Sequence, residues 1–245
     1  MLSVVPQLLC TVRDCRLPLA RVERRVVCAR GHSFDVARSG YVNLLQPHDR
    51  RSREPGDSAE MVAARRRLLD SGMFSPIDAA IASMTFGVSL DVGCGEGHTP
   101  STCGIDISIP AIEAAAKRYP NREWIVANAD RFIPYEDASF DVVLSITSRL
   151  NPPEFRRVVR DRVLIAIAGP DDLVELRGHT RDRVERTIEM FAPLFQLDRH
   201  ERIAFRTPVD RDALHDLVVS TYRPKRMKEI DAVTISRDLL LFCPS

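Results

Sequence analysis

The sequence predicts an α/β domain with a mostly parallel sheet and helices on both faces, preceded by a small cysteine-rich module. Three observations support this prediction. From residue 76 onward, short apolar runs alternate with helical patterns, as in a parallel sheet covered on both sides. Three alternating glycines follow the first apolar run, and three of the six cysteines lie close together near the N-terminus. The 245 residues can hold one domain of about 150–200 residues and a small module. We therefore divide the chain into residues 1–45 (the module), 46–75 (a connector and linker helix) and 76–245 (the α/β domain).

The clustered cysteines have the spacing of a zinc site. They follow the pattern Cys-x4-Cys-x12-Cys-x3-His, which offers two pairs of soft ligands to a tetrahedral metal at Cys10, Cys15, Cys28 and His32. Residues 17–19 and 24–27, between the two pairs, are expected to form the strands of a zinc-ribbon hairpin. A module of this size is too small to bury a hydrophobic core. The metal would therefore supply most of its folding free energy. The alternative is a set of unrelated thiols.

A polar, basic connector, residues 46–55, leads to the linker helix. Asp57 or Ser58 is placed to cap this helix, which continues through Leu69 and stops at Ser71-Gly72. Asp57 and Glu60 are also carboxylates that could act as a base, but a helix cap explains Asp57 and a place in the first helical turn explains Glu60 equally well. We assign no catalytic base.

The glycine-rich stretch is the most informative motif of the chain. A buried strand is predicted at residues 88–92, and the loop after it carries Asp91, Gly93, Gly95, Glu96 and Gly97. Glycines there allow a sharp turn and a close approach of the backbone to a ligand. Asp106, at the tip of the following short strand, suits the paired hydroxyls of a ribose. The alternatives are a nicotinamide-dinucleotide loop and a glycine turn that binds no ligand.

The remainder of the α/β domain continues the alternation. Strands are predicted at 123–127, 140–146, 163–168 and 239–242, and helices at 110–119, 181–192 and 210–220. Asn151 to Glu154 has the pattern of a helix start, with a cap residue, two prolines and an acid. Asn128 and Ala129 stand at the tip of the strand at 123–127. In open α/β sheets ligands bind outside the carboxyl ends of the strands, where the glycine loop, Asp106 and Asn128 all lie.

Composition and charge narrow the functional classes. The net charge is only +1, but residues 10–70 hold 13 arginines against 8 acids. Arginine pairs with phosphates and stacks on bases, so this basic front suits a nucleic-acid partner. No apolar run approaches the roughly 20 residues of a membrane span, and the first ten residues lack the pattern of a signal peptide. We expect a cytoplasmic protein whose grouped thiols bind metal rather than form disulfides.

Several longer segments together resemble one family. They include Gly31 to Ala37, Gly40 to Leu45, Arg51 to Met61, Ala64 to Gly72, Asp91 to Gly97, Gly104 to Ser108 and Ala114 to Pro120. This set is similar to the 23S rRNA guanine-N1 methyltransferases, a zinc-containing class I group that includes the tylosin-resistance type. The likeness covers nearly the whole chain, most specifically residues 10–130.

The resemblance implies a Rossmann-like class I methyltransferase domain behind a zinc ribbon, with S-adenosylmethionine and zinc as cofactors. It implies a hairpin of 23S rRNA as the partner and no membrane, with a homodimer as an open alternative to a monomer. The implied cofactor-binding residues are Phe74, Asp91, Gly93, Gly95, Glu96, Gly97, Asp106, Ile107, Asn128 and Ala129. A core phenylalanine at a helix end explains Phe74 equally well. We expect five front arginines to bind RNA phosphates, namely Arg24, Arg25, Arg50, Arg51 and Arg53.

The chain departs from this family pattern just after the glycine loop. Only six residues, 98–103, separate Gly97 from Gly104, whereas a parallel crossover normally takes a dozen or more residues, usually with a helix. Pro100 also cuts any helix short. We predict an extended or one-turn connector and weakened cofactor binding. This leaves two alternatives to an rRNA methyltransferase: an RNA-binding descendant without catalysis, and a methyltransferase acting on a small molecule.

Overall fold

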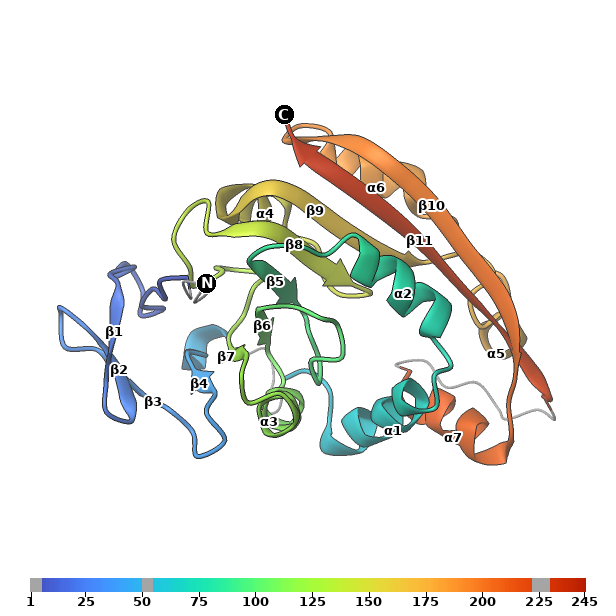
Figure 1. Cartoon of the computed structure of the whole chain (residues 1–245), viewed down its shortest axis with the longest axis horizontal. Coiled ribbons are helices and arrows are strands. Elements are labelled where there is room, and N and C mark those ends of the chain that lie inside the picture. Colours follow the sequence, from blue (N-terminus) through green and yellow to red (C-terminus); the bar gives the residue numbers. More distant parts are fainter. Residues whose placement is uncertain (1–5, 50–54, 222–229) are drawn as a thin grey trace.

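A twisted eight-stranded sheet forms the centre of the molecule (Figure 1). The computed structural model describes residues 6–49, 55–221 and 230–245. The strand order is β10-β11-β9-β8-β5-β6-β7-β4. In chain order the strands are β4 (Val42–Asn43), β5 (Ser89–Val92), β6 (Cys103–Asp106), β7 (Glu123–Val126), β8 (Phe140–Ile146), β9 (Val159–Ala168), β10 (Phe195–Pro208) and β11 (Ala232–Pro244). The pairs from β4 to β9 are parallel, and β11 and β10 add an antiparallel edge. The mostly parallel sheet is therefore confirmed.

The antiparallel edge differs most from the prediction. The final strand was expected only at 239–242, but β11 runs over 13 residues and pairs along its length with β10, which was not predicted. β10 contains Gln, Asp, His and Arg at most of its exposed positions, because it lies at the edge of the sheet. Its few apolar residues therefore give little signal of a strand.

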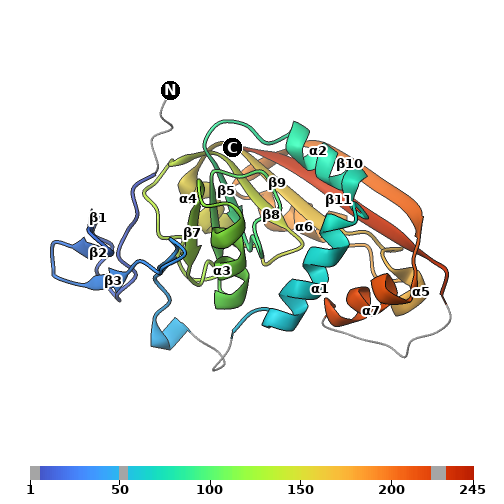
Figure 2. The same ribbon diagram turned by 60° about the horizontal axis from the view of Figure 1, so that its bottom comes forward.

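Helices cover both faces of the sheet (Figure 2). They are α1 (Ala59–Asp70), α2 (Ser75–Ser83), α3 (Ile109–Arg118), α4 (Pro152–Val158), α5 (Val174–Arg177), α6 (Val184–Phe191) and α7 (Arg211–Val219), with a 3-10 turn η1 (Pro47–Asp49). Along β8 the side chains alternate between two cores. Val143 packs into the core that contains residues of α4 and α6, whereas Val142 and Leu144 pack into the core of α1, α2, α5 and α7. This is the covered parallel sheet expected from strands that are apolar on both sides.

Of the two predicted helix caps, one is confirmed and one is wrong. Ser58, rather than Asp57, caps α1, and its hydroxyl accepts the Met61 N–H at 3.2 Å. Asn151 does precede α4, but its side chain makes no cap bond. Its amide instead donates to the carbonyls of Ala129 and Asp130, at 2.9 and 3.0 Å. The predicted cap therefore ties α4 to the loop after β7.

The N-terminal module has a small antiparallel sheet of its own, in the order β1 (Leu19–Val22), β2 (Arg25–Cys28) and β3 (Ser33–Asp35). The second predicted strand agrees closely with β2. The first begins two residues later than expected, at Leu19, and β3 was not predicted. β4 belongs to the main sheet, where it pairs with β7, so the main sheet begins before residue 45. The domain boundaries at 45 and 75 remain predictions.

The short connector between β5 and β6 has no helix, as its length predicts. β5 and β6 are nonetheless parallel neighbours, with Leu90 opposite Cys103. Thr102 closes the return by bonding with Ser89 in both directions, at 3.1 and 3.2 Å. The prediction of a connector without a regular helix is therefore confirmed. Among the residues the structure describes, no helix is long and apolar enough to cross a membrane.

Candidate functional site

The four predicted zinc ligands meet at one point of the N-terminal module. Cys10 follows a short bridged segment, Cys15 lies in a tight turn, Cys28 ends β2, and His32 precedes β3. Their ligand atoms all lie within 4.8 Å of one another. Two hydrogen-bonded turns, from Cys15 N–H to the Val12 carbonyl and from Gly31 N–H to the Cys28 carbonyl, hold the two halves of the cluster.

The spacing of these atoms fits a tetrahedral zinc ion. Cys15 Sγ lies 3.8 Å from Cys28 Sγ, and His32 Nδ1 lies 3.4 Å from Cys10 Sγ and 3.5 Å from Cys28 Sγ. A zinc ion with Zn–S bonds of about 2.3 Å and Zn–N bonds of about 2.0–2.1 Å separates such ligand atoms by about 3.5–3.8 Å. Burial raises the pKa of the Cys10 thiol to about 12, so metal binding must release its proton.

The glycine loop lies at the carboxyl end of β5, near the middle of the sheet. All three of its glycines have positive φ. A Cβ at Gly97 would come within 2.2 Å of the Trp124 ring, so that glycine is required by the protein's own packing. At Gly95 the nearest atom to such a Cβ would be Nη1 of Arg65, at 3.7 Å. The loop therefore leaves space at Gly95 for the close approach of a ligand.

Asp106 closes the other side of this loop from the end of β6. One carboxylate oxygen accepts the Gly95 N–H at 2.9 Å, and the other accepts the Ser108 N–H at 2.8 Å. These bonds fix both oxygens, and each retains a lone pair for a ribose hydroxyl. Burial raises the pKa of Asp106, while the two N–H groups and Arg65 oppose that rise.

Two further acids are buried at the loop without their full hydrogen bonds. Asp91 is 1% exposed and Glu96 is 4% exposed. Oδ1 of Asp91 and both carboxylate oxygens of Glu96 have no hydrogen-bond partner in the described structure. Burial raises the pKa of Asp91 to about 7, against a lowering contribution from the Thr99 hydroxyl. Burial also raises the pKa of Glu96, and the positive charges of Arg65 and Arg66 offset part of that rise. Buried polar groups are normally paired, so these oxygens indicate that the loop lacks hydrogen-bond donors that a bound polar ligand could supply.

The segment before α1 lies across this site, a feature that the sequence did not reveal. A Cβ at Gly56 would fall within 2.7 Å of Ser108, and the Ser108 hydroxyl donates to the Asp57 carbonyl at 2.7 Å. The Asp57 carboxylate pairs with Arg65 on α1. Asp57 thus positions Arg65 beside Gly95. Glu60 is exposed in the first turn of α1.

The other expected cofactor residues lie at varied distances from the loop. Ile107 follows Asp106 and is half-buried. Asn128 and Ala129 follow the neighbouring strand β7, but the Asn128 amide donates to the Asp49 carbonyl at 2.9 Å, away from the glycine loop. Phe74 precedes α2 and packs against the core beneath it. Roles for these residues in cofactor binding remain predictions.

The five front arginines are only partly described. Arg24 is exposed in the hairpin turn before β2. Arg25 lies 3.5 Å from Asp35 across the module sheet, an exposed ion pair that contributes little to stability. Arg50, Arg51 and Arg53 lie outside the described residues.

The chain matches two family models and several known proteins. Residues 9–53 match a zinc-ribbon family described as the N-terminal region of RlmA, and residues 90–161 match a methyltransferase domain family. A 23S rRNA (guanine(748)-N(1))-methyltransferase of Streptomyces fradiae is 33% identical over 242 residues, which cover 88% of this chain and 85% of that protein. The chain belongs to the 23S rRNA (guanine-N1)-methyltransferase family. The family includes a Bacillus subtilis (strain 168) relative, provisionally named for the same activity, that is 32% identical over 95% of both chains.

Solved structures support the fold of the methyltransferase domain. One chain comes from the complex that the Haloferax volcanii Trm112 methyltransferase activator forms with a provisionally assigned methyltransferase. It has a TM-score of 0.51 and 16% identity, and the match covers 74% of this chain and 93% of that one. At that identity the likeness shows the fold alone. The class I methyltransferase fold, the zinc ribbon and the family predicted from the sequence are thus confirmed.

Proposed function

We propose that this protein transfers a methyl group from S-adenosylmethionine to N1 of a guanine in a hairpin of 23S rRNA. One observation carries the proposal: a Cys3His cluster of tetrahedral dimensions lies in the same chain as a glycine loop closed by the Asp106 carboxylate. Membership of the 23S rRNA (guanine-N1)-methyltransferase family indicates that both features serve one reaction. The first is suited to fixing an RNA-binding module, and the second to holding a nucleoside.

The residues of the chain would bind and orient the reactants. When bound, the cofactor supplies an activated methyl group. Asp106 would accept the ribose hydroxyls, and Arg65, held by Asp57, is placed to receive an anionic group of the ligand beside Gly95. Methylation of N1 would form a nitrogen–carbon bond as the sulfur–methyl bond breaks, with S-adenosylhomocysteine as the leaving group and the N1 proton released, so the reacting atoms must be aligned and shielded from water.

One observation favours a weak cofactor site. In place of a crossover helix, the chain has a groove of about 350 Å³ between α2 and the connector, lined by Asp78, Ile81, His98 and Pro100 among others. Without that helix, fewer backbone N–H groups point toward a bound carboxylate. A descendant that binds RNA without catalysis is therefore the second candidate, and a small-molecule methyltransferase is the third.

A methyl-transfer assay separates the three candidates. The zinc-loaded chain is incubated with methyl-labelled S-adenosylmethionine and unmodified 23S rRNA, and the modified base is located as a stop to reverse transcription. We expect label at one guanine and none on rRNA already methylated at that position. Cofactor binding without transfer to rRNA would favour a small-molecule substrate. Rejection of the cofactor at millimolar concentration, with RNA still bound, would favour the non-catalytic descendant.

An rRNA substrate is consistent with a cytoplasmic location, which we propose together with the activity. A homodimer is a separate proposal. It is tested by sedimentation equilibrium of the purified chain with and without RNA.

A further inference from the structure

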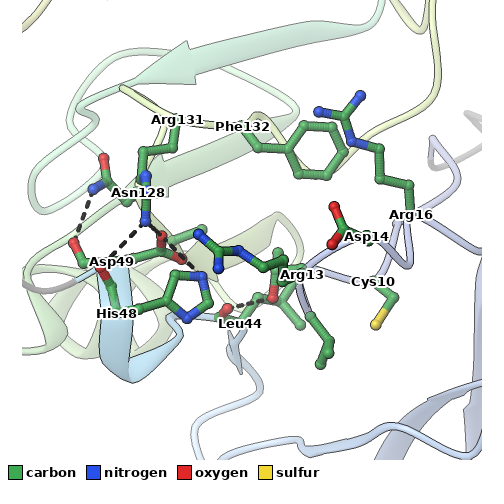
Figure 3. Close-up of a pocket in the computed structure, with 13 residues that line it drawn as sticks. Cys10, Arg13, Asp14, Arg16, Leu44, His48, Asp49, Asn128, Arg131 and Phe132 are labelled. Atoms are coloured by element: carbon green, nitrogen blue, oxygen red, sulfur yellow. Dashed lines mark hydrogen bonds and ion pairs between the residues drawn. The ribbon is translucent and has the colours of Figure 1, made fainter.

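A second pocket lies between the zinc module and the methyltransferase sheet (Figure 3). It has a volume of about 180 Å³ and is half open to solvent. The turn at residues 11–16, η1 and the segment after β7 surround it. In the sheet, β7 has β4 on the side of this pocket and β6 on the side of the glycine loop. The pocket therefore lies on the other side of β7 from the glycine loop, although Asn128, one of the expected cofactor residues, also lines it.

Two arginines at the rim have no carboxylate partner. Arg13 and Arg16 are both exposed, and no hydrogen bond or ion pair joins either side chain to another described residue. The Arg16 guanidinium lies over the Phe132 ring, 4.7 Å from its centroid. Figure 3 shows Arg13 directed into the pocket and Arg16 extended beside Phe132. The two guanidinium groups are therefore available to a ligand.

The other charged groups around the pocket are largely paired. Asp49 accepts a bond from Arg131 at 2.6 Å and lies 3.6 Å from the ring of His48. Asp14 adds a carboxylate to the same rim. A site that contains charges of both signs attracts a simple inorganic anion only weakly. A ligand with a phosphate, a flat ring and N–H donors can satisfy Arg13, Arg16 and Asp14 together.

The zinc site holds these arginines in place. Arg13 and Arg16 flank Cys15 closely in sequence, and the Cys15 N–H bonds to the Val12 carbonyl at 3.0 Å. Asp14 and Arg16 both have positive φ, at 59° and 50°, which non-glycine residues adopt only under strong local constraint. A metal bound through Cys15 would fix this turn, so the rim would be formed before any ligand binds.

We propose that this pocket binds one unpaired nucleotide of the RNA substrate, separate from the guanine that is methylated. Arg13 pairs with its phosphate, and its base stacks on the Arg16 guanidinium, which Phe132 supports from the other side. Unpaired bases are recognised in this way in RNA hairpin loops, by stacking on aromatic or guanidinium planes. The inference rests on the proposed function, because it takes RNA as the substrate.

Two substitutions test the two contacts separately in the full, zinc-loaded chain. Arg13→Gln removes a phosphate contact and should lower the slope of log affinity against log salt by about 0.7 for binding to unmodified 23S rRNA. Arg16→Lys keeps the charge but loses the stacking plane, so the slope should stay while affinity falls about fivefold or more. Both variants should raise KM for RNA and leave binding of S-adenosylhomocysteine and the zinc content unchanged. Arg186→Gln, at an exposed position on α6, is the matched control.

The outcomes distinguish this inference from the proposed function. If both variants bind and methylate rRNA as the wild type does, the pocket holds no nucleotide and the proposed function stands. If the wild type neither binds nor methylates 23S rRNA, both proposals fail. A loss of affinity in Arg186→Gln equal to that in Arg13→Gln would also overturn the inference, because the effect would then reflect general charge.

Discussion

Replacing Asp106 with alanine tests the cofactor site most directly. Its carboxylate suits the paired hydroxyls of a ribose. Two backbone N–H groups hold the carboxylate in place, at 2.9 and 2.8 Å. Asp106→Ala removes the acceptors for a ribose and leaves those N–H groups without a partner. Hydrogen bonds to a charged group contribute about 1.5–3 kcal/mol, so the dissociation constant should rise about 10- to 150-fold.

The measurement is calorimetric titration of S-adenosylhomocysteine into the purified, zinc-loaded chain. Because the variant also loses two internal hydrogen bonds, its thermal unfolding without ligand is recorded alongside. Asp198→Ala, at an exposed position on β10, is the matched control and should change neither quantity. An Asp106→Ala variant that binds the ligand with wild-type affinity would refute the assignment of this carboxylate to the cofactor.

Three further predictions follow from the site. Cys28→Ser should lose the single zinc ion and unfold the N-terminal module, whereas Cys243→Ser should keep the zinc ion and the folded module. A Cys28→Ser variant that still holds one zinc ion per chain by metal analysis would contradict the assignment of Cys28 as a ligand. Because burial raises the pKa of Asp91 to about 7, the folded state keeps the proton that the unfolded state loses above about pH 4. Asp91→Asn should therefore stabilise the ligand-free protein increasingly from pH 4 to 7 and by a constant amount above, and a pH-independent difference in melting temperature would argue against this. The hydrogen bond that the His98 ring donates to the Asp78 carboxylate raises the pKa of His98, so this pair contributes stability below about pH 6.5 that is lost as pH rises through the folded pKa. Asp78→Asn should abolish that dependence at a cost below about 1 kcal/mol, and melting curves from pH 5 to 9 measure it.

The parts of the fold that the sequence predicted are those with a local signal. The buried run of β5, its glycines and Asp106 lie within 18 residues, so one segment contains both the strand and the site. The zinc ligands likewise lie within 23 residues and follow a metal-binding spacing. The connector was predicted from its length of six residues and from Pro100, because so short a segment with a proline cannot form a crossover helix.

The rest depends on contacts between distant segments. The second pocket joins Arg13 and Arg16 to Phe132, which lies more than a hundred positions further along the chain. No spacing rule connects them. The two-residue strand β4 is defined by its pairing with β7, about eighty residues further along the chain. The Asn128 amide donates to the Asp49 carbonyl of η1, a contact between segments 79 residues apart, and its expected role at the cofactor remains a prediction.

The glycine loop keeps its conformation in this chain although no crossover helix follows it. Side chains from two other segments, the stretch at β7 and helix α2, hold the loop instead. Arg122 donates to the carbonyls of Gly97 and Thr99 at 3.1 and 2.9 Å, and His98 bonds to Asp78 on α2 at 2.9 Å. The Trp124 ring fills the space next to Gly97. These contacts satisfy the carbonyls of the loop, whereas a helix would direct its N–H groups toward a ligand. The geometry of the loop is therefore retained while part of its electrostatic attraction for an anion is lost, and Arg65 is the cation best placed to offset that loss.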